Sequence, residues 1–254
     1  MTAKIRNIKQ SFNSTHQSRY KNLLVSGCSF TFNNSEEHAC SWPYYLKDLA
    51  GFDQVYDCSQ SGAGNNHIFN SVINEVELNK NITPDSTLII VMWSGLSRTD
   101  VISTIDVTKD WHHMSNYHFD NKFSTLSIFD TNTNDNAVDT LCYHYRRLID
   151  PDARVYESML KVIGLYNYLK NKNFNFVFLN YMDPTEDLKS ISTPLTDTFT
   201  SLMDTVMYLG TYAKNTRKLE YNDGHPSPNG YLGWTQEHLI PYLVSIGQLQ
   251  TVTP

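Results

Sequence analysis

Cysteine is scarce in this chain of 254 residues. Its four cysteines, Cys28, Cys40, Cys58 and Cys142, show no C-x-x-C spacing and are too sparse for a disulfide framework. Reduced thiols are therefore expected, which suits the cytoplasm. Residues 1–20 are polar and contain no apolar stretch of signal-peptide length. We predict a cytoplasmic protein, or one released without a signal peptide, for example with a phage particle.

Long hydrophobic runs and basic clusters are also missing. The apolar runs are far too short to cross a bilayer. Lysine and arginine number 20 against 26 aspartates and glutamates, which gives a formal net charge of −6. No lysine or arginine cluster forms a stripe that would bind phosphates. We therefore predict neither a membrane nor a nucleic acid as partner, and the oligomeric state stays open.

The chain does contain apolar strands that alternate with helices. Strands are predicted from Leu23 towards Ser29 and over 54–57, 87–93 and 174–179; helices are predicted over 42–49, 66–78, 155–169, 202–209 and 229–246. This alternation is typical of an α/β fold whose parallel sheet is covered by helices on both faces. With 40% hydrophobic residues, the whole chain, 1–254, is predicted to form one domain.

Two segments interrupt the alternation. Residues 100–150 are rich in Asn, Asp, Thr, His and aromatic side chains and are too long for an ordinary connection. We interpret them as an insertion over the active face. Residues 183–200 are predicted to form a second, irregular excursion.

Ser29 and His225 are the candidate catalytic residues. The strand from Leu23 breaks at Gly27, which places Ser29 beyond its C-terminal tip, where ligands of parallel sheets bind. A serine becomes nucleophilic when an imidazole takes its proton and a carboxylate holds that imidazole. Asp223 and His225, in the segment Asp-Gly-His-Pro, are able to fill these roles. Taken singly, each segment is also an ordinary turn or helix cap.

The order of these motifs resembles that of the SGNH (GDSL-like) hydrolase superfamily, over most of the chain. Gly27-Cys28-Ser29 is similar to the family's Gly-Asp-Ser block, with Cys28 in place of the usual acid. The resemblance implies a three-layer α/β/α sandwich and Ser29 as nucleophile. Cys28 is a rival nucleophile, but a buried apolar role is the better default, and alternation directs its side chain away from Ser29.

The other blocks are matched less completely. The second block supplies a backbone N–H to the oxyanion, and Gly62 in Ser-Gly-Ala-Gly-Asn fits it, together with the N–H of Ser29. The third block normally offers an asparagine, which the segment Trp-Ser-Gly-Leu-Ser-Arg lacks; Ser94, Ser97 and Asn65 are the alternatives. In the family's last block the acid lies three residues before the histidine, a position that Asn222 occupies here. We therefore assign Asp223, two residues before His225, as the acid that orients the histidine, and keep Asn222 as the fallback.

The resemblance implies a serine esterase that acts through an acyl-enzyme and needs neither metal nor organic cofactor. We predict that it hydrolyses a small acyl ester, with carbohydrate O-acetyl groups as the first choice, because the aromatic residues near the insertion suit sugar rings. Arg98, Trp93 and Trp111 are the predicted substrate-binding residues. Histidines 112, 113 and 118 are interpreted as exposed loop residues and not as metal ligands.

Two alternatives remain open at this stage. The first is a lipase or thioesterase for longer acyl chains, or an acyltransferase that passes the acyl group to a sugar. The second is a catalytically silent carbohydrate-binding or structural protein, which the missing asparagine and the shifted acid favour.

Overall fold

The computed structural model describes most of the chain outside the long insertion. The described residues are 16–32, 41–98, 100–103, 124–127, 140, 143–144, 147–148, 150–189, 191, 193–204, 206–217 and 224–251. Statements about the structure refer to these residues.

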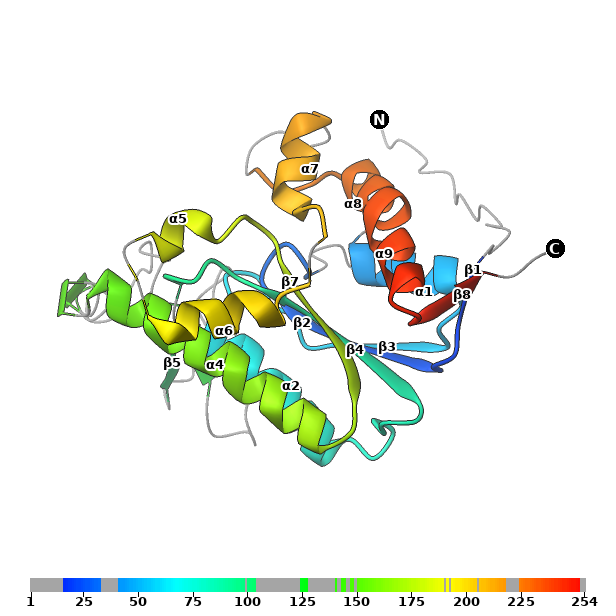
Figure 1. Ribbon diagram of the computed structural model, residues 1–254, viewed down its shortest axis with the longest axis horizontal. Helices are drawn as coiled ribbons and strands as arrows, with labels where there is room; N and C mark the ends of the chain where they lie inside the picture. The colour runs from blue at the N-terminus through cyan, green and yellow to red at the C-terminus, as the bar shows by residue number, and fades with distance from the viewer. Residues whose placement is uncertain are drawn as a thin grey trace, which may run out of the picture.

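A parallel sheet forms the centre of the fold, and its strands follow the order β3-β2-β4-β7 (Figure 1). The strands are β2 (Asn22–Gly27), β3 (Gln54–Asp57), β4 (Thr87–Trp93) and β7 (Asn175–Asn180). Gly27 pairs with Met92, and Met92 pairs with Leu179. Strands β2, β4 and β7 therefore end close to one level, so the residues after them meet at a single edge.

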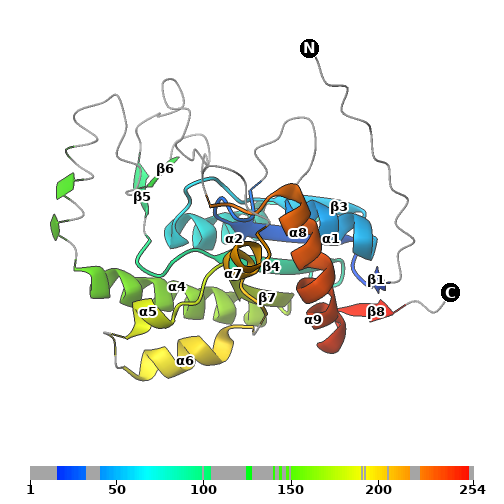
Figure 2. The same ribbon diagram turned by 90° about the horizontal axis from the view of Figure 1, so that it is seen from above.

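Helices cover both faces of this sheet (Figures 1 and 2). One face carries α2 (Asn65–Leu78), α4 (Pro151–Asn171) and α6 (Pro194–Leu202); the other carries α1 (Trp42–Ala50), α8 (Pro228–Trp234) and α9 (Ile240–Ser245). The predicted three-layer α/β/α sandwich is confirmed.

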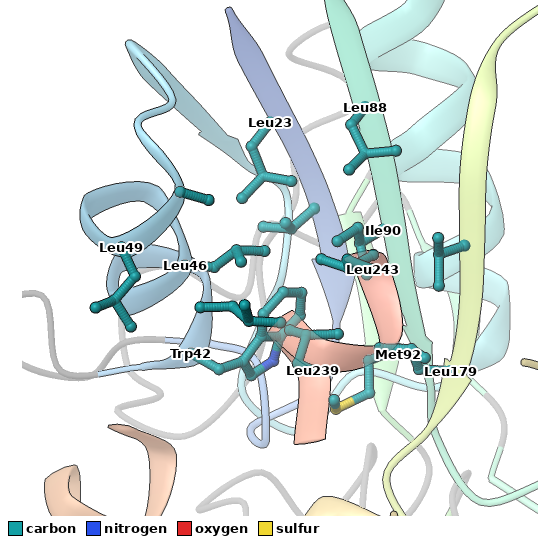
Figure 3. Packing of buried hydrophobic residues seen from close by; sticks show 14 of the residues in the cluster. Leu23, Trp42, Leu46, Leu49, Leu88, Ile90, Met92, Leu179, Leu239 and Leu243 are labelled. Carbon is teal, nitrogen blue, oxygen red and sulfur yellow. The ribbon is translucent and has the colours of Figure 1, made fainter. Parts of the chain in front are cut away.

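Alternation along β4 divides the core into two clusters. Leu88, Ile90 and Met92 pack with α1 and α9 in the cluster of Figure 3. Ile89, Val91 and Trp93 pack on the opposite face with α2 and α4. All of β4 is buried, as its continuous apolar sequence predicts for a central parallel strand.

Local signals set the helix ends. Helix α1 has a proline in its first turn and ends at Gly51, whose φ of 70° is the left-handed conformation common after helices. Helix α4 begins at Pro151, where the Asp150 carboxylate accepts a hydrogen bond from Asp152 N. The helix was predicted to start only at Val155, because its first turn is polar and shows no apolar periodicity.

Three predictions in the second half of the chain need correction. The excursion over 183–200 contains α5 (Thr185–Leu188) and most of α6. The helix expected over 202–209 does not form, since α6 ends at Leu202 and α7 (Leu209–Asn215) begins at Leu209. The predicted closing helix is divided by a π-helical turn, η1 (Thr235–Leu239), directly before the first turn of α9, where Pro241 cannot donate a backbone hydrogen bond.

Short strands complete the fold. Strand β1 (His16–Ser18) pairs antiparallel with β8 (Leu249–Thr251). In the segment predicted to be an insertion, β5 (Asp100–Ser103) pairs antiparallel with β6 (Ser124–Ser127), which the sequence pattern did not predict. The rest of 100–150 lies largely outside the described residues. No described helix combines the length and apolar character needed to cross a bilayer.

Candidate active site

Ser29 lies on a tight turn directly after β2. The N–H groups of Thr31 and Phe32 donate to the carbonyl oxygen of Cys28 at 2.8 and 3.0 Å. This turn requires glycine before it, because a Cβ on Gly27 would lie 2.2 Å from the Thr31 hydroxyl oxygen. The turn therefore presents Ser29, which is partly exposed, at the carboxyl edge of the sheet.

His225 approaches Ser29 from the segment before α8. Its Nε2 lies 2.7 Å from Ser29 Oγ. The Phe30 ring packs beside the imidazole at 4.7 Å between centroids, and the Tyr231 hydroxyl donates to the Ser29 carbonyl oxygen at 3.4 Å. Helix α8 begins after Ser227, whose hydroxyl accepts from Gly230 N at 3.2 Å. Ser227 lies two residues after His225, so the cap fixes the start of α8 close to the histidine.

The residue predicted to orient His225 belongs to the segment just before it. Asp223 and its fallback Asn222 both lie outside the described residues. Their assignment stays a prediction from the sequence.

Gly62 lies in a turn that is hydrogen-bonded to the end of β2. Gln60 N donates to the Gly27 carbonyl oxygen at 3.0 Å, and Gly62 itself is buried with a φ of 76°, which favours glycine. In the described part of the chain, no hydrogen bond engages the backbone N–H of Gly62 or of Ser29. Two backbone donors are thus left available near the candidate nucleophile.

Asp57 holds the start of the same turn. Its carboxylate accepts hydrogen bonds from Ser59 N at 2.9 Å, from the Ser59 hydroxyl and from the Tyr44 hydroxyl. Burial raises the pKa of Asp57 to about 6.

Asn65 braces the loop after β4 and is not a free donor. Its Nδ2 donates to Gly95 O at 3.2 Å and to Ser158 Oγ at 3.1 Å, while its Oδ1 accepts from Ser94 N at 3.1 Å. With both amide hydrogens engaged and only 1% of its surface exposed, Asn65 is a positioning residue. The expectation that it donates to an oxyanion is corrected.

Ser94 and Trp93 also differ from expectation. The Ser94 hydroxyl has almost no exposed surface and no hydrogen-bond partner among the described residues, so a substrate oxygen does not reach it here. Trp93 is fully buried and packs edge-on against Phe178 at 5.5 Å between centroids. Since strand alternation turns Trp93 into the core, its predicted substrate-binding role is wrong.

Arg98 and Cys28 lie near Ser29. Burial raises the pKa of the Cys28 thiol, and the charge of Arg98 and a hydrogen bond with the Ser29 side chain act against this rise. The Cys28 side chain is therefore next to the Ser29 hydroxyl, contrary to the expectation from alternation, because the chain already turns at this residue. A raised pKa keeps the thiol protonated and makes it a poor nucleophile.

Asp100 is a buried carboxylate that the sequence reasoning missed. It accepts from Gly64 N at 2.8 Å and from His67 N at 3.0 Å, at the start of α2. Burial raises the pKa of Asp100 to about 6. Asp100 lies far from Asn65 in the sequence, so no local pattern near Asn65 indicates that the Asp100 carboxylate caps α2.

Most of the aromatic residues of the insertion that were predicted to suit sugar rings, Trp111 included, lie outside the described residues. Tyr143 is described and half-exposed, with His144 packed edge-on at 5.4 Å between ring centroids. Within the described ranges, no three His, Cys, Asp or Glu side chains are placed to hold a metal ion.

Comparisons with solved structures give matches of low similarity, whose names are those of esterases and lipases. No family model and no curated protein matches the chain. A psychrotrophic esterase from Pseudoalteromonas sp. is similar in structure, with 11% identity, a TM-score of 0.48, and coverage of 88% of this chain and 99% of that one. A lipase from a goat rumen metagenome is also similar in structure, with 11% identity, a TM-score of 0.44, and coverage of 89% of this chain and 97% of that one.

Proposed function

We propose that this protein is a serine ester hydrolase of the SGNH type. The observation that carries the proposal is the 2.7 Å separation between His225 Nε2 and Ser29 Oγ at the carboxyl edge of a parallel sheet. This is the hydrogen bond through which an imidazole removes the proton of a serine nucleophile.

In the proposed reaction, Ser29 Oγ attacks the ester carbonyl carbon while His225 takes the hydroxyl proton. The carbonyl oxygen becomes an oxyanion, to which the N–H groups of Ser29 and Gly62 donate. His225 then returns the proton to the leaving alcohol, which leaves an acyl-enzyme. Water, activated by the same imidazole, releases the acid and restores Ser29. Asp223 is the proposed partner that holds the imidazole.

We propose a small acyl ester as substrate, with O-acetyl groups on a carbohydrate as the first choice. The half-exposed Tyr143 and the aromatic residues of 100–150, such as Trp111, support a sugar-binding surface. Arg98, close to Cys28 and therefore to Ser29, is suited to bind an anionic group on the substrate.

Longer acyl chains form a second candidate class, which Met182 favours. A Cβ on Gly210 would lie 3.7 Å from both Met182 Cγ and Phe30 Cε1, and Phe30 packs beside His225. Met182 is 52% exposed, so an apolar side chain faces solvent close to the proposed catalytic pair. An acyl chain would bury that surface.

Initial rates on p-nitrophenyl acetate, butyrate and octanoate test the proposal. The wild-type protein is compared with Ser29→Ala and with Ser86→Ala, a matched control that lies just before β4 at the opposite edge of the sheet. Acetate turnover that only Ser29→Ala abolishes supports the short-chain esterase, whereas a preference for octanoate supports the second candidate. Turnover that survives Ser29→Ala contradicts the proposal, and no turnover on any ester, natural acetylated glycans included, favours a silent binding protein.

A further inference from the structure

The side-chain donor of the oxyanion hole is the part of the proposed site that the third block leaves open. Asn65 has both amide hydrogens engaged, and the Ser94 hydroxyl is buried out of reach. Another side chain at the carboxyl edge, Tyr181, follows β7 directly and was not among the residues singled out from the sequence.

The Tyr181 ring belongs to a stack that includes the proposed base. Its centroid lies 4.3 Å from that of Phe30, and the Phe30 centroid lies 4.7 Å from that of His225. Tyr181 and Phe30 both pack against the two core clusters, so they lie at the carboxyl edge of the sheet, between the two helical layers. This stack fixes the orientation of the Tyr181 ring relative to the catalytic pair.

The hydroxyl end of Tyr181 extends across the end of β4 towards β2. A Cβ on Gly95, in the loop after β4, would lie 3.8 Å from the Tyr181 hydroxyl oxygen. The phenol also interacts electrostatically with Cys28, the neighbour of Ser29, with Arg98 and with Asp187, whose Oδ2 would lie 3.9 Å from the same Cβ. Adjacent strands are about 4.8 Å apart, so a tyrosine after β7 is long enough to reach past β4.

This hydroxyl is free to donate. Among the described residues none forms a hydrogen bond with it, and the side chain is only partly buried. Burial, reinforced by Cys28 and Asp187 and opposed by the charge of Arg98, raises the pKa of Tyr181 above its usual value, so the phenol keeps its proton at neutral pH. A protonated hydroxyl held at the rim of a site is a suitable partner for a developing negative charge.

We propose that the Tyr181 hydroxyl donates a hydrogen bond to the oxyanion, in place of the asparagine that the third block lacks. The inference rests on the proposed ester hydrolysis. The hydroxyl completes a set of three donors with the N–H groups of Ser29 and Gly62. No proton is transferred by Tyr181, which acts only by donation in the transition state.

The test compares Tyr181→Phe with wild type on p-nitrophenyl acetate or on whichever of the three esters turns over fastest. Phenylalanine keeps the ring packed on Phe30 and removes only the hydroxyl. Loss of one such donor lowers kcat by about 10²-fold to 10³-fold. We expect a fall of this order with KM and the unfolding midpoint unchanged. Tyr166→Phe is the matched control, because Tyr166 packs against Phe176 away from the site.

A fall in kcat of less than about tenfold for Tyr181→Phe, while Ser29→Ala abolishes turnover, overturns the role of Tyr181 and leaves the serine mechanism intact. A larger loss in Ser97→Ala than in Tyr181→Phe overturns it as well. If Ser29→Ala is as active as wild type, the proposed function itself fails, so the two failures are distinguishable.

A second measurement keeps both ring and hydroxyl, in case Tyr181→Phe does not fold. Fluorinated tyrosine incorporated at position 181 has a more acidic phenol, which loses its proton, and hence its ability to donate, at lower pH. We expect the alkaline limb of the kcat profile to move to lower pH. A limb that stays at the wild-type position overturns the proposal.

Discussion

His225 Nε2 and Ser29 Oγ lie 2.7 Å apart although 196 positions separate them in the sequence. Their contact joins the turn after β2 to the segment before α8, two elements on either side of the same sheet edge. The hydrogen bond predicts that the reactivity of Ser29 depends on His225.

A fluorophosphonate probe tests this dependence without knowledge of the substrate. We expect the probe to label Ser29 in the wild-type protein and to label His225→Ala at least about 10³-fold more slowly, because the serine loses its base. Labelling rates followed by mass spectrometry give the comparison. His238→Ala is the control, since His238 packs against Tyr212 and not against Ser29. Equal labelling of His225→Ala and wild type would contradict the role of His225.

Gly27→Ala tests the turn that presents Ser29. The new Cβ would lie 2.2 Å from Thr31 Oγ1 and 3.0 Å from Met92 O, so the turn has to shift. We expect a loss of about 1–3 kcal/mol in the free energy of unfolding, together with a marked loss of activity. Urea unfolding and ester turnover measure the two effects. Gly164→Ala in α4, where the nearest atom of Phe69 is 3.4 Å away, should fold normally and stay active.

Much of the fold could be predicted from the sequence because its strands are buried on both faces. Thr87–Trp93 forms a strand with the predicted bounds, since a continuous apolar run leaves few other structures possible. The helices at 183–202 were missed because α5 has only four residues and Phe199 is the single buried side chain of α6. A helix that buries so little leaves almost no periodicity in the sequence.

The candidate site was predictable where a motif lies on one strand end and not where it depends on contacts between elements. The pairing of Ser29 with His225 was expected from the order of the motifs. The engagement of Asn65 by Gly95 and Ser158 depends on how α2 and α4 pack, which no local pattern encodes. Tyr181 carried no signal, because a single tyrosine after a strand is common.

Asn65→Ala tests the brace between α2 and the loop after β4. The substitution leaves Ser94 N and Gly95 O without their partner in a buried place, and each such group costs about 1–3 kcal/mol. We expect the free energy of unfolding to fall by about 2–4 kcal/mol and ester turnover to fall with it. Chemical denaturation checks the first effect. Asn70→Ala, which removes only a bond to Asn66 O within α2, serves as control; an equal loss there would refute the brace.

Asp100 makes the stability of the protein sensitive to pH. Its pKa is raised by burial from 3.8 to about 6 in the folded chain. The folded state therefore holds a proton between these values that the unfolded state has released. The stabilisation is fully present below about pH 4 and is lost as the pH rises through about 6. A difference of this size corresponds to about 3 kcal/mol. Asp57, with a pKa raised to about 6 as well, adds to the same slope.

Asp100→Asn isolates the contribution of this carboxyl. The asparagine oxygen can take the place of Oδ2, which accepts from Gly64 N at 2.8 Å and His67 N at 3.1 Å, so the start of α2 keeps its cap. Without a titrating group, the variant should lose less stability than wild type between pH 4 and about 7, and it should be the more stable of the two at neutral pH. Urea denaturation at several pH values measures the difference, with the exposed Asp85→Asn as control. If the free energy of unfolding varies with pH in the same way for Asp100→Asn and wild type, the Asp100 carboxyl is ionised over the whole pH range measured. The two N–H donors at the start of α2 would then hold it in the charged form.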